Sequence, residues 1–179
     1  GHFTELDDLL AHSLTSIISE IGQVFQLKKR ISERISNYQI ICDLIIQLSS
    51  TKDINGFLST LSKGLLKCFH CSHSQLFKVS QNSRCYWVLK DLNSSKKGTP
   101  LPIGFGLIGY SISKKNIFSF VQPERSVLFR KESDRPVPNI HLHSILVCPI
   151  LDENGEVKFA IVLYNKNNSE SFSEEETIY

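Results

Sequence analysis

The first quarter of the chain places apolar residues at alternating steps of four and three. Eleven positions follow this heptad spacing, and ten of them are apolar or aromatic: Leu10, Leu14, Ile17, Ile21, Val24, Lys28, Ile31, Ile35, Tyr38, Cys42 and Ile45. Such a repeat keeps one seam of a helix facing a partner along its whole length. Lys28 is the polar exception, and a single polar residue in an apolar seam sets register and oligomeric state. The pattern therefore predicts a long N-terminal helix that pairs with a second copy of the chain.

Further apolar residues lie beside this seam. Ile18, Phe25 and Ile46 make the apolar stripe wider than a two-stranded seam requires. The width favours a bundle in which the helix packs on its own domain and on a second copy, as a parallel dimer. The alternative is an amphipathic helix that covers only its own core, although one small sheet does not need so long a cover.

Beyond residue 50 the apolar period changes several times. We expect the following elements: a helix capped by Asp53 and running to Cys68, strands at 75–79 and 84–89, an exposed loop at 92–99, a short helix at 107–113, a strand at 117–121, and a long loop at 122–139 with one helical turn at 127–130. The last third of the chain reads as two strands, 144–151 and 156–164, around Asn154-Gly155. Both residues tolerate positive φ, so the pair predicts a tight hairpin turn.

Composition sets the broad class. The chain has 179 residues, 41% of them apolar, and a formal net charge of +2, which fits one globular domain with an appendage. No dense basic patch and no membrane-spanning apolar run is present, so we expect no nucleic-acid or membrane partner and a soluble, cytoplasmic protein. The chain begins Gly1-His2 and lacks methionine. We therefore expect a fragment of a longer protein, ending within a C-terminal helix.

A glycine-rich turn precedes the short helix. Residues 102–109 contain the pattern G-x-G-x-x-G, but no strand leads into it and no long helix follows, so it is not a dinucleotide-binding fingerprint. The glycines still permit a sharp entry, which places the N–H groups of Leu107 and Ile108 at a helix N-terminus, where anions bind. A turn that only docks the helix on the sheet is the alternative.

The order of these elements resembles the GAF domain, and the resemblance spans residues 35–179. It implies an α+β fold: an antiparallel sheet of five or six strands, helices on one face, and a ligand pocket on the other, with residues 1–34 forming a separate signalling helix. The sequence is most similar to the regulatory GAF domains of cyclic nucleotide phosphodiesterases. Their pocket-closing motif is matched by Asn165, Lys166 and Phe172, with Glu176 in the place of an aspartate and Thr177 in the place of a glutamate.

The same resemblance implies a set of ligand-binding residues. A cyclic nucleotide phosphate would bind Leu107 and Ile108, the base would face Ser74, Gln75 and Trp87, and the long loop would close over it with Phe129, Arg130 and His141. Each side chain also has a plainer role. Trp87 and Phe129 suit a core, and Arg130 suits a solvated loop.

The cysteines and histidines suggest little chemistry. Cys68, His70, Cys71 and His73 lie too close together to close into a tetrahedral site, so we expect no metal there and thiols that are buried or idle. His141 and His143 would share a metal or haem only if both faced the same way. No catalytic residue and no cofactor is expected beyond a possible cyclic nucleotide ligand.

The sequence thus predicts a regulatory GAF domain that is not itself an enzyme. Its function would be to bind a small molecule, with a cyclic nucleotide as the best candidate, and to signal through dimerising helices to an effector domain outside the chain, such as a phosphodiesterase. One alternative is a ligand-free dimerisation or protein-interaction module, whose pocket is filled by Phe105, Phe118 and Phe120. A cysteine oxidoreductase on the same fold is the remote alternative.

Overall fold

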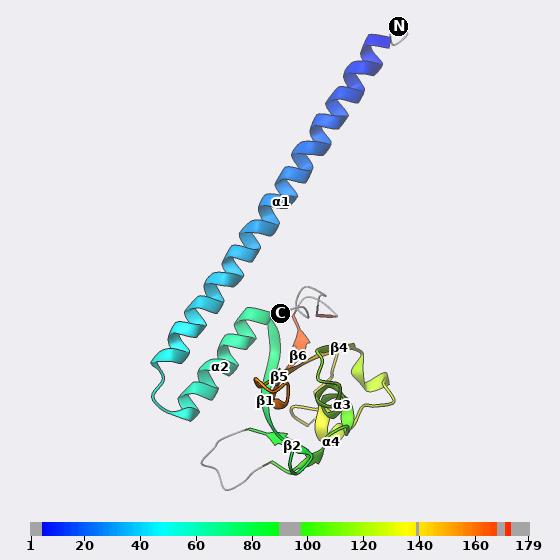
Figure 1. Cartoon of the computed structure of the whole chain (residues 1–179). Helices are drawn as coiled ribbons and strands as arrows, with labels where there is room; N and C mark the ends of the chain where they lie inside the picture. Colours follow the sequence, from blue (N-terminus) through cyan, green and yellow to red (C-terminus); the bar gives the residue numbers. More distant parts are fainter. Residues whose placement is uncertain (1–4, 90–97, 139, 168–170, 173–179) are drawn as a thin grey trace. The chain divides into compact units, whose positions relative to one another are not determined.

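A computed structural model of the chain describes residues 5–89, 98–138, 140–167 and 171–172, with backbone only at 5–11 and 54. The chain divides into two compact units, residues 1–43 and 44–179. The helix α1 (Glu5–Ser50) is continuous through the first unit and into the second (Figure 1). The boundary expected at residue 34 therefore lies inside an unbroken helix.

The helix α2 (Ile54–Phe69) begins where its cap predicts. The Asp53 side chain accepts a hydrogen bond from the Gly56 N–H at 2.7 Å, which satisfies one of the free donors of the first turn. The helix ends at His70, whose left-handed backbone returns an N–H to the Leu66 carbonyl. Both ends of α2 are therefore set by local hydrogen bonds.

Six strands form one antiparallel sheet in the order β3-β2-β1-β6-β5-β4. The strands are β1 (Cys71–Ser80), β2 (Cys85–Val88), β3 (Leu101–Pro102), β4 (Phe118–Val121), β5 (Ser144–Leu151) and β6 (Val157–Lys166). The long strands β1, β6 and β5 lie in the middle of the sheet. The two C-terminal strands, β5 and β6, therefore lie between β1 and β4, and β6 pairs with β1. This arrangement is the α+β fold with an antiparallel sheet of five or six strands that the sequence predicts.

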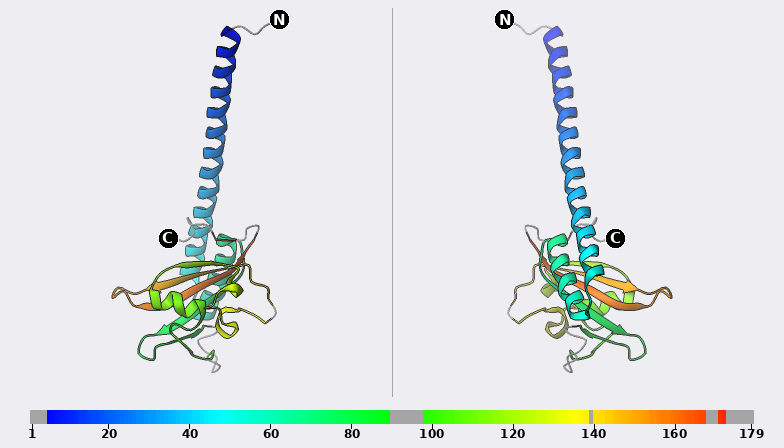
Figure 2. Two further views of the ribbon diagram at one scale, coloured as in Figure 1. Left: turned by 90° about the vertical axis from the view of Figure 1, so that its right-hand side faces the viewer. Right: turned by 90° about the vertical axis from the view of Figure 1, so that its left-hand side faces the viewer.

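Helices cover both faces of this sheet (Figure 2), whereas the resemblance implied helices on one face only. On one face α2 packs through Leu65, Leu66 and Phe69 against Leu146 and Leu163. The other face carries the larger core and is covered by α3 (Gly106–Lys114), a 3-10 turn η1 (Pro123–Arg125) and the short helix α4 (Lys131–Asp134). Because side chains alternate along a strand, neighbouring residues of β1 serve different faces.

The long loop differs from the expectation in one detail. The helical turn predicted at 127–130 is wrong, because the helical turns form at Pro123–Arg125 and at Lys131–Asp134 instead. Arg130 has an extended backbone, with φ −132° and ψ 124°. Its N–H donates to the Asp134 carboxylate at 2.8 Å, so Asp134 and not a preceding residue determines where α4 begins.

The turn of the β5–β6 hairpin is also longer than predicted. Of Asn154 and Gly155, Gly155 alone has positive φ, at +72°. Gly155 N–H donates to the Asp152 carbonyl at 2.9 Å, and Asp152 N–H donates to the Glu156 carbonyl at 2.8 Å. These bonds define a three-residue loop that ends in a left-handed glycine, not a two-residue turn. The Asp152 side chain adds hydrogen bonds from the N–H groups of Asn154 and Glu156.

In the described part of the chain, no helix combines the length and the apolar character needed to cross a bilayer.

Candidate functional site

The N-terminus of α3 is built by the glycine-rich turn. Gly104 and Gly106 have positive φ, at +94° and +71°, which lets the chain turn sharply from β3 into the helix. The expectation that no strand leads into this turn is wrong, because the two-residue strand β3 directly precedes it. Tyr86, fully buried on β2, donates its hydroxyl to the Phe105 carbonyl at 2.7 Å and holds the turn against the sheet. The first free N–H groups of α3 therefore point into the protein.

The carboxylate of Asp134 occupies this helix N-terminus. Its Oδ2 accepts from the Leu107 N–H at 3.0 Å and its Oδ1 from the Ile108 N–H at 3.3 Å. The Arg130 N–H and the Ser133 hydroxyl, both from the loop, complete the set at 2.8 and 2.9 Å. Asp134 has no exposed surface. The two amides predicted to bind a ligand phosphate are thus bound by an anionic group of the protein itself.

Burial makes this carboxylate costly in its charged form. Burial raises the pKa of Asp134, and the hydrogen bonds from Leu107, Arg130, Ser133 and Ile108 only partly oppose that rise. Tyr164 is fully buried, and its pKa is raised by burial and by the negative charge of Asp134. Asp134 is therefore well hydrogen-bonded but poorly solvated.

Two further contacts hold the loop that carries Asp134. We name residues 122–138 and 140–143 the closing loop. Gln75 on β1 accepts from the Tyr164 hydroxyl at 2.8 Å and donates to the Pro136 carbonyl at 3.3 Å. At the end of the loop, Asn165 donates to the His141 carbonyl and accepts from the His143 N–H, both at 2.8 Å. The closing loop is thus attached to α3, to β1 and to β6.

Several residues predicted to bind a ligand lie around this site. Leu107 and Ile108 are fully buried at the helix N-terminus, and Phe129 packs against the same core. Gln75 binds the closing loop. Arg130 is exposed, and its guanidinium donates to the carbonyls of Val127 and Phe129 at 3.0 and 2.8 Å. His141 is exposed at the end of the loop.

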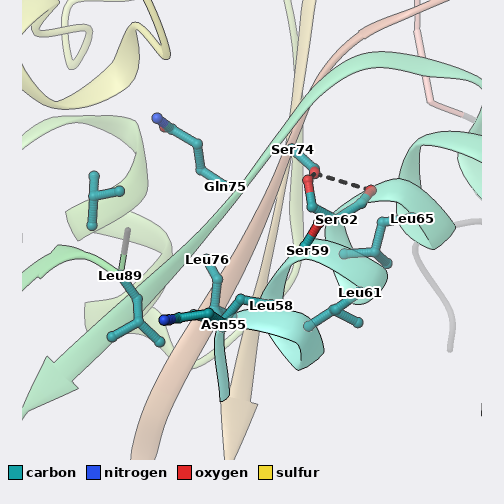
Figure 3. A pocket seen from close by; sticks show the side chains of 11 residues that line it. Asn55, Leu58, Ser59, Leu61, Ser62, Leu65, Ser74, Gln75, Leu76 and Leu89 are labelled. Carbon is teal, nitrogen blue, oxygen red and sulfur yellow. Dashed lines mark hydrogen bonds between the residues drawn. The ribbon is translucent and has the colours of Figure 1, made fainter. Parts of the chain in front are cut away.

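Ser74 and Trp87 are not brought to this site. Their neighbours Gln75 and Tyr86 face α3, so Ser74 and Trp87 point to the opposite face of the sheet. Ser74 lies 2.7 Å from the Ser62 hydroxyl of α2, and Figure 3 shows it turned toward α2 while Gln75 points away. Both serines line an open cleft of about 460 Å³ between α2 and strands β1 and β2, together with leucines 58, 61, 65, 76 and 89.

The predicted pocket-closing motif is described only in part. Asn165 adopts positive φ, +53°, and fixes the end of the closing loop. Lys166 places its Nζ 5.7 Å from the centre of the Phe172 ring, and Phe172 is buried on the α2 face with Leu65, Leu66 and Phe69. The interaction expected between Lys166 and Glu176 lies outside the described residues.

The five cysteines, all among the described residues, form no disulfide bond with one another. Burial raises the pKa of Cys148 to about 11 and also raises that of Cys68, which disfavours the reactive thiolate. Residues 68–73 do not cluster as metal ligands, and no group of three His, Cys, Asp or Glu side chains anywhere in the described residues is arranged to hold a metal.

Sequence reasoning missed the residue at the centre of the site. Asp134 stands 27 and 26 residues from its partners Leu107 and Ile108. In the sequence it is one of several charges in a loop, and no spacing rule connects it to the glycine-rich turn. Its short neighbour Ser133 gave the only local hint, since Ser-Asp pairs favour hydrogen bonds to nearby backbone.

Comparison with known proteins identifies the fold. No protein-family model matches the chain, and no curated protein sequence matches it. Among solved structures, the chain is similar to the GAF domain of a phosphoenolpyruvate-protein phosphotransferase from Coxiella burnetii, with TM-score 0.66 and 20% identity over 80% of this chain and 84% of that one. For the GAF domain of the Acinetobacter phosphoenolpyruvate-protein phosphotransferase the TM-score is 0.62 and the identity 16%, over 79% of this chain and 83% of that one. For a free methionine-R-sulfoxide reductase from Neisseria meningitidis the TM-score is 0.59 and the identity 15%, over 80% of each chain. The chain therefore has the GAF fold, which both regulatory domains and enzymes use.

Proposed function

We propose that this chain is a regulatory module that senses a small anionic ligand and signals through α1 to an effector domain, without catalysing a reaction itself. One observation carries the proposal: the α3 N-terminus holds an anion, and that anion is delivered by a loop. A helix N-terminus with free N–H groups binds phosphates and carboxylates alike. A ligand anion can therefore take the place of the Asp134 carboxylate on the same donors.

The exchange would couple binding to the closing loop. When Asp134 leaves, the Leu107 and Ile108 amides pass to the ligand, while Arg130 and Ser133, which lie in the same loop as Asp134, can keep their bonds to it and move with it. The raised pKa of Asp134 supports this step, because a carboxylate that burial disfavours is displaced more easily than a solvated one. A cyclic nucleotide is our candidate ligand, since its phosphate is a single negative charge and its base is flat enough to lie under Phe129.

Signalling through α1 is supported by its unpaired apolar seam. In the described part of the first unit, most large apolar side chains of α1 are between 42% and 69% exposed, from Ile41 to Phe25. A seam of this length is far larger than an isolated chain leaves in water. We propose that a second copy covers it in parallel, as the heptad spacing requires, so that a change at the sensor reaches both helices.

Calorimetry and thermal unfolding test the sensor. Cyclic AMP, cyclic GMP and inorganic phosphate are titrated into the wild type, into Asp134→Ala, and into Glu132→Ala, a matched control on the exposed side of α4. We expect a cyclic nucleotide at a hundred times its Kd to stabilise the wild type by about 2.7 kcal/mol. Asp134→Ala should bind more tightly, because its internal competitor is gone, and Glu132→Ala should bind like the wild type.

A second function fits the complete burial of Asp134. A site sealed by its own carboxylate serves equally in a ligand-independent interaction module, where α1 alone carries the function. Phe118 and Phe120 stack at 6.0 Å and Phe120 packs on the core, so aromatic side chains fill this face of the sheet. If neither the wild type nor a folded Asp134→Ala binds any of the three compounds at millimolar concentration, the sensor proposal is wrong and this second function replaces it.

A further inference from the structure

The segment His141-Leu142-His143 presents two imidazoles to solvent side by side. Leu142 is 2% exposed and belongs to the core, so the residues on either side of it point outward. The two rings have centres 4.7 Å apart and planes at 89°. Neither imidazole takes part in a hydrogen bond with the described residues. The two histidines that the sequence left undecided therefore do face the same way.

The backbone beneath this pair is fixed from three directions. The Asn165 side chain bridges the His141 carbonyl and the His143 N–H, with 2.8 Å at each contact. The His143 carbonyl accepts from the Gln122 N–H, also at 2.8 Å. Leu142 anchors the same residues to the core. Two ligands held in this way lose little freedom when they bind a common ion, which favours tight binding.

The ring separation suits a shared metal ion. A histidine nitrogen binds Zn²⁺, and late transition metals in general, at about 2.0–2.1 Å, so each ring centre lies roughly 3.2 Å from the metal. Two such rings on adjacent positions, about 90° apart, have centres roughly 4.5 Å from each other. The observed 4.7 Å is close to that value. Binding would require side-chain rotations that turn one nitrogen of each ring toward a common point.

We propose that His141 and His143 form a two-histidine site for a divalent transition-metal ion of the nickel, copper and zinc class. In the described residues no carboxylate or thiol joins them as a third ligand. Water fills the other positions, so the site binds its ion more weakly than a closed structural site does. Imidazole nitrogen selects these metals over Mg²⁺ and Ca²⁺, which prefer oxygen ligands.

Calorimetric titration with Ni²⁺ tests the site, because Ni²⁺ binds imidazole without oxidising cysteine side chains. All proteins carry His2→Ala, so that this histidine does not contribute to the titration. We expect one Ni²⁺ per chain for the reference protein. His141→Ala and His143→Ala should each weaken binding by at least about tenfold, because the second ligand of a linked pair acts at high effective concentration. The matched control is His12→Ala, which removes an exposed histidine of α1 and should leave the affinity unchanged.

Three results would overturn the proposal. The first is the absence of Ni²⁺ binding to the reference protein at millimolar concentration. The second is a double variant, His141→Ala with His143→Ala, that binds as tightly as the reference. The third is a loss in each single variant no larger than in His12→Ala. Unfolding measurements of every variant confirm that the exposed substitutions leave the fold intact, and none of these results depends on whether a cyclic nucleotide binds.

Discussion

At the scale of single residues, the charge of Asp134 is balanced between two opposing effects. Four hydrogen bonds and the positive end of α3 favour the carboxylate, while complete removal from water disfavours it. The net result is a pKa above the ordinary aspartate value of 3.8. The pKa values of Tyr86 and Tyr164 are raised by burial and by the charge of Asp134, so both tyrosines stay neutral.

A pH dependence follows from that direction. In the window between 3.8 and the raised value, the folded protein binds more protons at Asp134 than the unfolded chain does. Its contribution to the free energy of unfolding therefore grows as the pH falls through this window and is lost as the pH rises. Urea unfolding of the wild type and of Asp134→Asn is measured between pH 4 and pH 7, in steps of about half a pH unit. The free energy of unfolding of the wild type should rise relative to that of the variant as the pH falls. A constant difference would contradict the raised pKa.

Gly106 is required by the same carboxylate. A Cβ at this position would lie 2.1 Å from the Ser133 hydroxyl and 2.7 Å from the nearer Asp134 oxygen, on a backbone with φ +71°. Gly106→Ala should therefore lower the free energy of unfolding by about 2 to 5 kcal/mol, from strain and overpacking together. Gly104→Ala is the control: its φ is also positive, but nothing lies within 4 Å of the added Cβ. A smaller loss of about 1 to 2 kcal/mol is expected there, and equal losses in urea unfolding would show that the close approach to Asp134 does not matter.

At the scale of elements, the left-handed conformation of Gly155 in the β5–β6 turn determines the register in which the two strands pair. Asp152 accepts two backbone N–H bonds in the turn, and these bonds lower its pKa, the one from Glu156 most. The left-handed Gly155 then returns the chain to pair Leu151 with Val157. The register shift next to Leu151 accommodates the extra turn residue.

Substitutions in this turn distinguish its two central residues. Gly155→Val puts a β-branched side chain at positive φ and should cost about 1 to 3 kcal/mol of unfolding free energy. Asn154→Val is the matched control, because Asn154 has negative φ, and its loss should be clearly smaller. Thermal and urea unfolding measure both variants. Similar losses of unfolding free energy at the two positions would contradict the three-residue loop and support the tight turn at Asn154-Gly155 that the sequence suggested.

At the scale of the whole molecule, the two units differ in whether their apolar side chains are buried within the chain. The second unit buries its apolar residues on both faces of a sheet, whereas α1 in the first unit leaves a heptad seam exposed. Lys28 stands in the middle of that seam, where a polar residue specifies pairing at some cost in stability. Assembly through α1 is therefore expected to be separable from folding of the sheet.

A double substitution tests this separation. Ile21→Asp with Ile31→Asp puts unpaired charges in the proposed interface and should dissociate the dimer, because a buried unpaired carboxylate is strongly disfavoured. Neither residue belongs to the second unit, so the thermal unfolding of the sheet should persist. Ser19→Asp with Gln26→Asp, on the outer side of the heptad, should leave the dimer intact. Light scattering measures the mass of each protein, and a monomeric wild type in the micromolar range would refute assembly through α1.

The local pattern of residues was enough to determine most of the elements and the fold. The Asp53 cap, the period-two strands and the glycine turn before α3 each depend on residues adjacent in the chain, and each formed at the predicted place, although β1 begins at Cys71 and not at residue 75. The start of α4 and the hairpin turn were misjudged, because both depend on a carboxylate side chain that binds the backbone. Composition and spacing describe which conformations are favourable, but not which of two polar partners a free N–H will choose.

Only the tertiary structure decided what fills the site and which residues share a face. Leu107 and Ile108 were correctly placed at a helix N-terminus. Their partner Asp134 comes from a separate loop, which folding brings into the buried interior. Ser74 and Trp87 went to the opposite face, since a shift of one residue in strand alternation reverses a side chain. The backbone of His141 and His143 is held by Asn165 of β6, which is 24 and 22 positions away in the chain. Local sequence thus determined the secondary structure, while long-range packing determined the chemistry, because desolvation and hydrogen-bond choice depend on groups that meet only after folding.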